Sequence, residues 1–325
     1  MPVAREKLPI TVLIAARNEE ANIVKCLRGL DRAERVIVID SQSDDRTVEL
    51  AASLGAEVVQ FQYRGGYPKK RQWALDNLKI DTPWVLMVDA DEVVPEALWG
   101  EIAGAISSPD APEALAIVKG FHFLGRRFRF GGFSFAAVVL FRTGKARFEQ
   151  LVACPEAAQD MEVHERVIVD GRVGRLRTPL IHEDFKSLQA YIDRHNRYSS
   201  WEARLRFDLL TSGRYGCDSI RPRLFGNSQE RKRFLKLIAV RMPSEPWLWF
   251  AYHYFVCLGF LEGKRGLIAC QIRASYIRQV RAKMYELELR RQFSAGRLSQ
   301  MDENPGTVAS EQMYTHSATA EKVAA

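Results

Sequence analysis

The sequence predicts an α/β protein, with a mostly parallel sheet flanked by helices and an α-helical C-terminal extension. Between residues 10 and 100, short apolar runs alternate with segments of helical pattern. Such alternation with short connections is typical of parallel sheets built through right-handed crossovers. From Ser187 the apolar residues recur at helical spacing instead. With 325 residues, of which 47% are hydrophobic, the chain can form one large domain and a substantial appendage.

The elements expected in the first hundred residues follow one another in βα order. An apolar run with turn-type residues at both ends, such as WVLMVD, indicates a strand buried on both faces. The expected strands are Ile10–Ala16, Arg35–Asp40, Glu57–Phe61 and Trp84–Asp89, and the expected helices are Glu19–Leu30, Arg46–Leu54 and Lys69–Asn77. Further on, short β-prone pieces are expected at Ala116–His122, Ala136–Phe141 and Val167–Val169.

Polar residues gather where these strands end. Arg17–Glu20 follows the first strand, Asp40–Thr47 closes the second, and Asp89, Asp91 and Glu92 close the fourth. The carboxyl ends of parallel strands border the crevice in which open α/β sheets bind ligands, so the three clusters should converge. An Asp-x-Asp pair offers hard oxygen ligands to Mg²⁺ or Mn²⁺, which commonly bind through one or two carboxylates plus substrate phosphates. The cations of Lys69–Arg71, at an expected helix N-terminus, would suit phosphate oxygens.

These segments resemble glycosyltransferase family 2, whose members are inverting, nucleotide-sugar-dependent enzymes of the GT-A fold. The matching pieces are IAARNEEANI, VIVIDSQSDDRTVELA, KKRQWALD and WVLMVDADEVVP, in family order. The resemblance implies that Asp40 hydrogen-bonds the nucleotide base and that Ala15 and Glu19 line the base and ribose pocket. It also implies that Arg71 lies near the diphosphate. Asp89 and Asp91 would form the metal-binding pair, with Asp91 the direct ligand of Mg²⁺ or Mn²⁺.

Two His-Glu pairs in the second half are the candidates on the acceptor side. The transferases that decorate lipopolysaccharide cores resemble this chain in having Val-His-Glu at 163–165, which makes Glu165 the candidate general base. A carboxylate there would deprotonate the attacking hydroxyl while a metal stabilises the leaving nucleoside diphosphate. His182 is a candidate third metal ligand or diphosphate contact. The alternative for His182 is a surface pair at a strand end.

The C-terminal part also resembles the lipopolysaccharide-type subgroup and suggests contact with a membrane. As one helix, Trp247–Leu261 would span only about 22 Å, short of a hydrocarbon core of about 30 Å. Its Trp and Tyr residues favour the headgroup level, and basic residues flank it at 231–236 and 264–265. We therefore expect an interfacial anchor drawn to anionic lipid. The alternative is a core helix packed on the catalytic domain.

The expected organisation has three parts. Residues 1–185 form the catalytic domain, with a nucleotide-sugar half at 8–100 and an acceptor half at 115–185. Residues 186–293 form the helical, membrane-associating extension, ending in an amphipathic helix at Leu267–Gln292, and residues 294–325 form a disordered tail. Five scattered cysteines without a C-x-x-C pair, and no secretory signal pattern, favour the cytoplasm. The expected location is the inner face of the cell membrane.

The predicted function is transfer of a sugar, with a UDP-sugar as the expected donor, onto a lipid-linked or cell-envelope glycan. A nucleotidyltransferase is the alternative enzyme, since it shares a similar sheet, but a Gly-rich, basic loop would then follow the first strand, where this chain has ARNEE. The net charge of +7 suggests a nucleic-acid-binding protein as a further alternative. Its cations should then accompany exposed aromatics on a sheet, whereas here they flank an apolar segment, so no nucleic-acid partner is expected.

Overall fold

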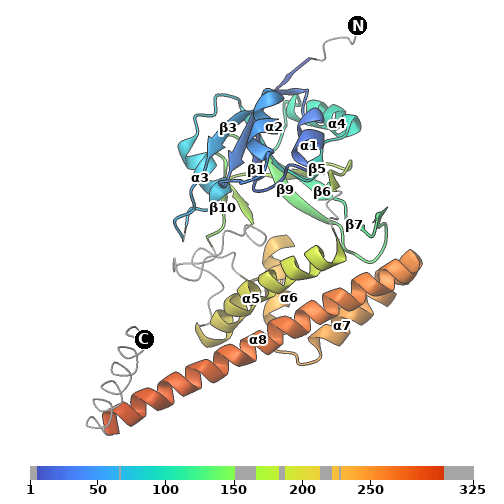
Figure 1. The fold of residues 1–325 in the computed structure, drawn as a ribbon. Helices are drawn as coiled ribbons and strands as arrows, with labels where there is room; N and C mark the ends of the chain where they lie inside the picture. Colours follow the sequence, from blue (N-terminus) through green and yellow to red (C-terminus); the bar gives the residue numbers. More distant parts are fainter. Residues whose placement is uncertain are drawn as a thin grey trace, which may run out of the picture.

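A seven-stranded sheet forms the centre of the N-terminal part of the chain (Figure 1). The computed structural model describes residues 6–65, 67–150, 166–182, 187–212, 222–226 and 228–303. The sheet consists of β1 (Leu8–Ala16), β2 (Ala33–Asp40), β3 (Glu57–Gln60), β4 (Trp84–Asp89), β6 (Ala114–Lys119), β9 (Phe135–Arg142) and β12 (Val173–Arg175). Their order is β12-β6-β9-β4-β1-β2-β3. All neighbours are parallel except β9, which runs antiparallel to both β4 and β6. The predicted mostly parallel sheet is confirmed.

The central strands are buried because helices cover the sheet. Nearly every side chain of β1 and β4 is buried, as continuous apolar runs predict for parallel strands. The covering helices are α1 (Ile23–Arg28), α2 (Thr47–Ser53), α3 (Lys70–Asn77) and α4 (Glu96–Ile106). Three further two-stranded pairings join β5 (Glu92–Val93) to β13 (Ile181–His182), β7 (His122–Phe123) to β8 (Arg126–Arg127), and β10 (Ala146–Phe148) to β11 (Val167–Val169).

Helix α1 is shorter than the predicted Glu19–Leu30. The backbone N–H groups at 18–20 donate to side chains of the loop after β2 and of the start of α2, with Asn18 bonded to Ser43 at 2.9 Å and Glu19 to Thr47 at 2.8 Å. These bonds hold residues 18–20 as a loop that joins the ends of β1 and β2. The helix therefore begins only at Ile23.

The C-terminal extension is a bundle of four helices: α5 (Leu188–Ser212), α6 (Ser228–Ala239), α7 (Glu245–Ala251) and α8 (Gly263–Glu303). Figure 1 shows α5 between the sheet and the long α8, with α7 alongside α8. A buried ionic network ties three of these helices together. Arg206 of α5 contacts Glu245 at 2.8 Å and Glu202 at 2.9 Å, and Lys236 of α6 contacts Glu202 at 3.0 Å.

The predicted single helix at Trp247–Leu261 is wrong in its geometry. Helix α7 passes into a π-helical turn at Tyr252–Val256, and a 3-10 turn follows at Gly259–Glu262. Between the two turns Leu258 adopts a left-handed conformation with φ of 60°, which no continuous helix tolerates. Among the described residues no helix combines the length and the hydrophobicity of a membrane span.

Two predicted boundaries at the end of the chain also differ. The amphipathic helix predicted at Leu267–Gln292 begins earlier, at Gly263, and continues to Glu303. The predicted disordered tail was placed from residue 294, so its first part is helical. Residues 304–325 lie outside the described residues.

Candidate active site

The sheet register brings the predicted site residues to one edge. Ala15 of β1 lies opposite Ile39 on one side and Asp89 on the other, and Ala16 lies opposite Asp40. The carboxyl ends of β1, β2 and β4 therefore meet, as parallel strands require. This edge is where open α/β sheets bind ligands.

Two carboxylates at and just after the end of β4 share one partly buried lysine. Lys119 Nζ lies 2.7 Å from Asp89 Oδ2 and 2.9 Å from Glu92 Oε1, and the second oxygen of Glu92 accepts the Asp89 backbone N–H at 3.0 Å. Burial raises the pKa of Glu92 and would lower that of Lys119, but the two carboxylates raise the lysine pKa above its usual range. Lys119 therefore stays protonated beside Asp89 and Glu92.

The second oxygen of Asp89 contacts a second cation, Arg71. Arg71 of α3 donates from Nη2 to Asp89 Oδ1. Burial would raise the pKa of Asp89, but the charges of Arg71 and Lys119 outweigh it and hold that pKa well below its usual range. Both oxygens of Asp89 are therefore occupied by protein cations.

Asp91 faces His182 instead. The antiparallel pairing of β5 and β13 places His182 opposite Glu92, and His182 Nδ1 lies 3.3 Å from Asp91 Oδ1. Burial would lower the pKa of His182, but its close contact with the Asp91 carboxylate raises it overall. Among the described residues, Asp91 Oδ1 is buried and accepts no well-aligned hydrogen bond.

The cations predicted to bind phosphate are only partly available. Lys70 Nζ donates to the Ala16 carbonyl at 3.0 Å. Lys69 is 2% exposed, and its ammonium lies 5.4 Å from the ring centre of Trp201 on α5. Arg71, the third, donates to the Asp89 carboxylate at the end of β4. The contact between Lys69 and Trp201 instead attaches α5 to the nucleotide-sugar half.

Asp40 and Glu19 build the loops that border the same edge. Asp40 is buried and accepts hydrogen bonds from the backbone N–H and the hydroxyl of Ser43, the first at 2.9 Å. Glu19 accepts a hydrogen bond from the Asn22 side chain at 2.7 Å. Both residues lie where the sequence places them, and their predicted contacts with a nucleotide stay predictions.

The three residues predicted to bind the metal, Asp89, Asp91 and His182, do not come together in one cluster. Within the described ranges, no three His, Cys, Asp or Glu side chains come together as a metal cluster. Asp91 and His182 are adjacent, whereas Asp89 is engaged by Arg71 and Lys119. Glu165, the predicted base, lies outside the described residues.

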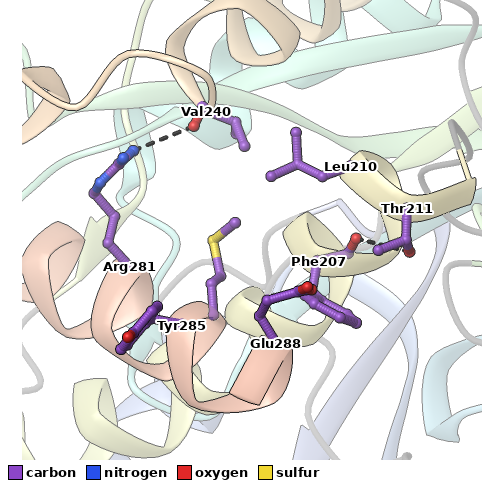
Figure 2. A pocket seen from close by; sticks show the side chains of 8 residues that line it. Phe207, Leu210, Thr211, Val240, Arg281, Tyr285 and Glu288 are labelled. Carbon is purple, nitrogen blue, oxygen red and sulfur yellow. Dashed lines mark hydrogen bonds between the residues drawn. The ribbon is translucent and has the colours of Figure 1, made fainter. Parts of the chain in front are cut away.

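A cavity of about 270 Å³ opens elsewhere, between α5, α8 and the end of α6 (Figure 2). Its walls are mainly apolar, and its rim includes Arg281, which donates to the Val240 carbonyl at 3.2 Å. The lining residues are Phe207, Leu210, Thr211, Val240, Arg281, Met284, Tyr285 and Glu288. None of them belongs to the sheet edge that carries the carboxylates, so this cavity is not the candidate active site.

Comparison with known families agrees with this geometry. Residues 11–145, which carry all the strand ends described above, match the family model described as Glycosyl transferase family 2. These residues form a family 2 glycosyltransferase domain. The family match thus covers the sheet that carries the carboxylates, and the helical bundle lies outside the matched residues.

Relatives match well beyond this domain. The chain is 26% identical over 286 residues to the lipopolysaccharide core biosynthesis glycosyltransferase LpsC of Rhizobium meliloti, covering 86% of this chain and 93% of that protein. An uncharacterized glycosyltransferase of Rickettsia typhi is 25% identical over 292 residues, covering 86% and 88%. A solved structure of glucosyl-3-phosphoglycerate synthase from Mycobacterium tuberculosis, in complex with Mn²⁺, UDP and glucosyl-3-phosphoglycerate, is 25% identical. The aligned part covers 36% of this chain and 45% of that one, with a TM-score of 0.29.

Sequence reasoning missed the central role of Lys119 in the transferase site. Its only signal was a single lysine closing an apolar strand, ALAIVK, before Gly120. A charged residue at the carboxyl end of a strand on this sheet could have been added to the candidates on position alone.

Proposed function

We propose that the protein is an inverting glycosyltransferase that moves a sugar from a nucleotide-diphosphate sugar, with UDP as the expected nucleotide, onto a lipid-linked or cell-envelope glycan. The observation that supports it best is the meeting of Asp89, Asp91, Arg71 and Lys119 at one sheet edge of a family 2 domain. Cations beside carboxylates can stabilise a leaving diphosphate and position a divalent metal. The relationship to LpsC, named for lipopolysaccharide core biosynthesis, supports the envelope acceptor.

A divalent metal fits this site through two residues. Asp91 Oδ1 is buried without a satisfied hydrogen bond, and His182 adds a ring nitrogen beside it. Mg²⁺ or Mn²⁺ binds readily to one or two carboxylates completed by substrate phosphates. When bound there, the metal would supply Lewis-acid stabilisation of the departing diphosphate. Asp89 would contribute indirectly, by orienting Arg71.

A donor screen tests the reaction class. Unfolding temperature should be measured with a panel of nucleotide-sugars, each with and without Mn²⁺. We expect one donor class to raise the melting temperature in a metal-dependent manner, because ligands that bind only the folded state stabilise it. Absence of any shift across the panel, together with no sugar transfer, would contradict the proposal.

Glu165 is proposed as the general base on the acceptor side. Glu165→Gln keeps the shape and removes the proton acceptor, so turnover should fall by roughly 10²- to 10⁴-fold while donor affinity stays near that of the wild type. Single-turnover rates and donor binding should be measured together. If donor binding collapses and the rate of bound substrate is unchanged, Glu165 belongs to the donor site and Asp184 becomes the next candidate.

Membrane association is proposed from an exposed apolar surface, here called the aromatic platform and defined as residues 245–262. Trp247 is 66% exposed, Phe255 60% and Val256 68%. An exposed apolar patch of this kind marks an interaction site, and basic side chains flank it. The exposed ones are Arg231, Lys232, Lys264 and Arg265. Lys236, also predicted to face lipid, is instead paired with Glu202. The proposed location is the inner face of the cell membrane.

Vesicle binding tests this surface. We expect the chain to bind anionic vesicles and to detach at high salt, because part of the attraction is electrostatic. Phe255→Ser with Val256→Ser should weaken binding by about tenfold or more. Leu54→Ser, at another exposed apolar residue in the nucleotide-sugar half, is the matched control. Protease protection of one flank of the platform in sealed vesicles would show a spanning segment instead, and lack of vesicle binding would favour a core role.

A further inference from the structure

Arg273 of α8 lies among aromatic rings from three helical segments. Its guanidinium carbon is 4.5 Å from the ring centre of Tyr276 and 5.9 Å from that of Trp249. Its charge also lowers the pKa values of His195 and His253, which burial has already lowered. The residues around Arg273 thus come from α5, α8 and the aromatic platform.

Arg273 has no acidic partner among the described residues, unlike Arg206 and Arg281 of the same bundle. Arg206 is held by Glu202 and Glu245, and Arg281 contacts Glu245 at 3.6 Å and two backbone carbonyls. Arg273 is half-buried, and its contacts with the described residues are with the rings of Tyr276 and Trp249. A half-buried cation without a counter-charge loses hydration that nothing in the described chain replaces.

The ring contacts leave the hydrogen-bonding edge of Arg273 without a partner among the described residues. A guanidinium stacks through its face, whereas its five N–H donors lie in its plane. Those donors match the oxygens of a phosphate group in a two-point contact. The chemistry of the site therefore favours an oxyanion, and the surrounding rings favour one carried on an apolar or sugar-containing molecule.

The position of Arg273 connects the aromatic platform to the catalytic edge. Trp249 and His253 belong to the platform, and His253 lies 2.6 Å from the Gly131 carbonyl of the catalytic domain. On the other side, His195 stacks on Tyr191 at 4.0 Å and contacts Tyr198 at 5.6 Å. Three residues beyond Tyr198 on the same helix, the ring centre of Trp201 lies 5.4 Å from the ammonium of Lys69, which precedes α3. A row of rings on α5 thus leads from Arg273 to the segment that carries Arg71.

We propose that Arg273 binds a phosphomonoester group of an amphiphile at the membrane surface, and so places a phosphate-bearing acceptor between the aromatic platform and the carboxylates after β4. This inference rests on the proposed function, because it assumes an acceptor that arrives from the membrane. It adds a substrate class: acceptors with a phosphate near the hydroxyl that receives the sugar.

Calorimetric titration with soluble short-chain lipids tests the site on the full chain. The probes are dihexanoyl phosphatidic acid, dihexanoyl phosphatidylcholine below its micelle concentration, and inorganic phosphate. We expect the wild type to bind phosphatidic acid more tightly than either of the other two. Arg273→Gln should weaken that binding by about tenfold to a hundredfold, the range for a lost hydrogen bond to a charged group. Arg273→Lys should fall between, since lysine keeps the charge without the planar fork.

Arg278→Gln is the matched control. Arg278 lies on the same helix and stacks on a platform tryptophan, with its guanidinium 4.7 Å from the Trp247 ring centre, yet it is exposed. Its variant should bind within about twofold of the wild type. Unchanged binding by Arg273→Gln would overturn the proposal, as would equal binding of phosphatidylcholine or of inorganic phosphate. If Arg273→Gln fails to fold by circular dichroism, Arg273→Lys and the three wild-type titrations decide. The titration contains no sugar donor, so a negative result would contradict phosphate binding at Arg273 without contradicting the proposed sugar transfer. Conversely, a chain that transfers no sugar could still bind phosphatidic acid.

Discussion

Asp91→Ala should abolish sugar transfer and leave the fold intact. The proposed metal loses its buried carboxylate ligand, and with it the Lewis-acid stabilisation of the leaving diphosphate, which is worth several kcal/mol. Each 1.36 kcal/mol corresponds to a factor of ten in rate, so we expect a loss of about 10³-fold or more. Stability should change by less than about 1 kcal/mol, because Asp91 faces only the imidazole of His182 among the described residues, at 3.3 Å.

A matched variant separates loss of the ligand from loss of an aspartate. Asp81 lies just before β4, at the opposite end of the strand, with its side chain 71% exposed. Asp81→Ala should keep turnover near that of the wild type. Initial rates should be measured across a Mn²⁺ titration for both variants. Turnover by Asp91→Ala at the wild-type rate, with the same metal dependence, would refute the proposed role.

The fold of the catalytic domain was predictable because local patterns determine it. β1 and β4 are mainly apolar runs closed by polar residues, and β2 ends in one, VIVID; short runs of this kind between turn-type residues favour buried parallel strands. The register then follows from packing, and it places Ala15 beside Asp89. The candidate residues at the strand ends were therefore brought to one edge as expected.

The bundle was less predictable because amino-acid composition does not show where its helices are interrupted. Residues 247–261 are apolar almost throughout, which indicates a helix, yet the chain turns at Leu258 and Gly259. There the Gly259 position has no room for a side chain, since a Cβ would lie 2.7 Å from the His253 carbonyl oxygen. Glu262, which is buried, then accepts the backbone N–H groups of Arg129 and Phe130 at 2.6 and 2.9 Å. These contacts join segments more than a hundred residues apart, and no local pattern encodes them.

Lys119 was missed for the same reason. It belongs to β6, which β9 separates from β4 in the sheet, so its contact with Asp89 depends on the order of the strands. Sequence spacing alone supplied the acids of the site and one of its cations, Arg71. The second cation required the topology.

Lys119→Met is expected to have the second large effect, on stability as well as turnover. The lysine is 16% exposed and compensates Glu92, which is fully buried, together with Asp89. Removing one partner of a buried ion pair leaves an uncompensated charge and typically costs about 3–5 kcal/mol. Urea unfolding of Lys119→Met should show a loss of this size. Lys79→Met, at a lysine 86% exposed in its surface pair with Asp81, should change stability by less than about 0.5 kcal/mol.

A second substitution distinguishes loss of charge balance from loss of packing. Glu92→Gln in the Lys119→Met background removes the buried charge that the first change left alone, and glutamine can still accept the Asp89 backbone N–H that Glu92 accepts at 3.0 Å. If electrostatics dominates, the double variant should be more stable than Lys119→Met, as when both members of a buried pair are replaced. Turnover should stay low, because Asp89 would still lack the cation that holds it in place opposite Arg71. A double variant no more stable than Lys119→Met would mean that Lys119 acts by filling space, and its proposed electrostatic role at the carboxylates would be wrong.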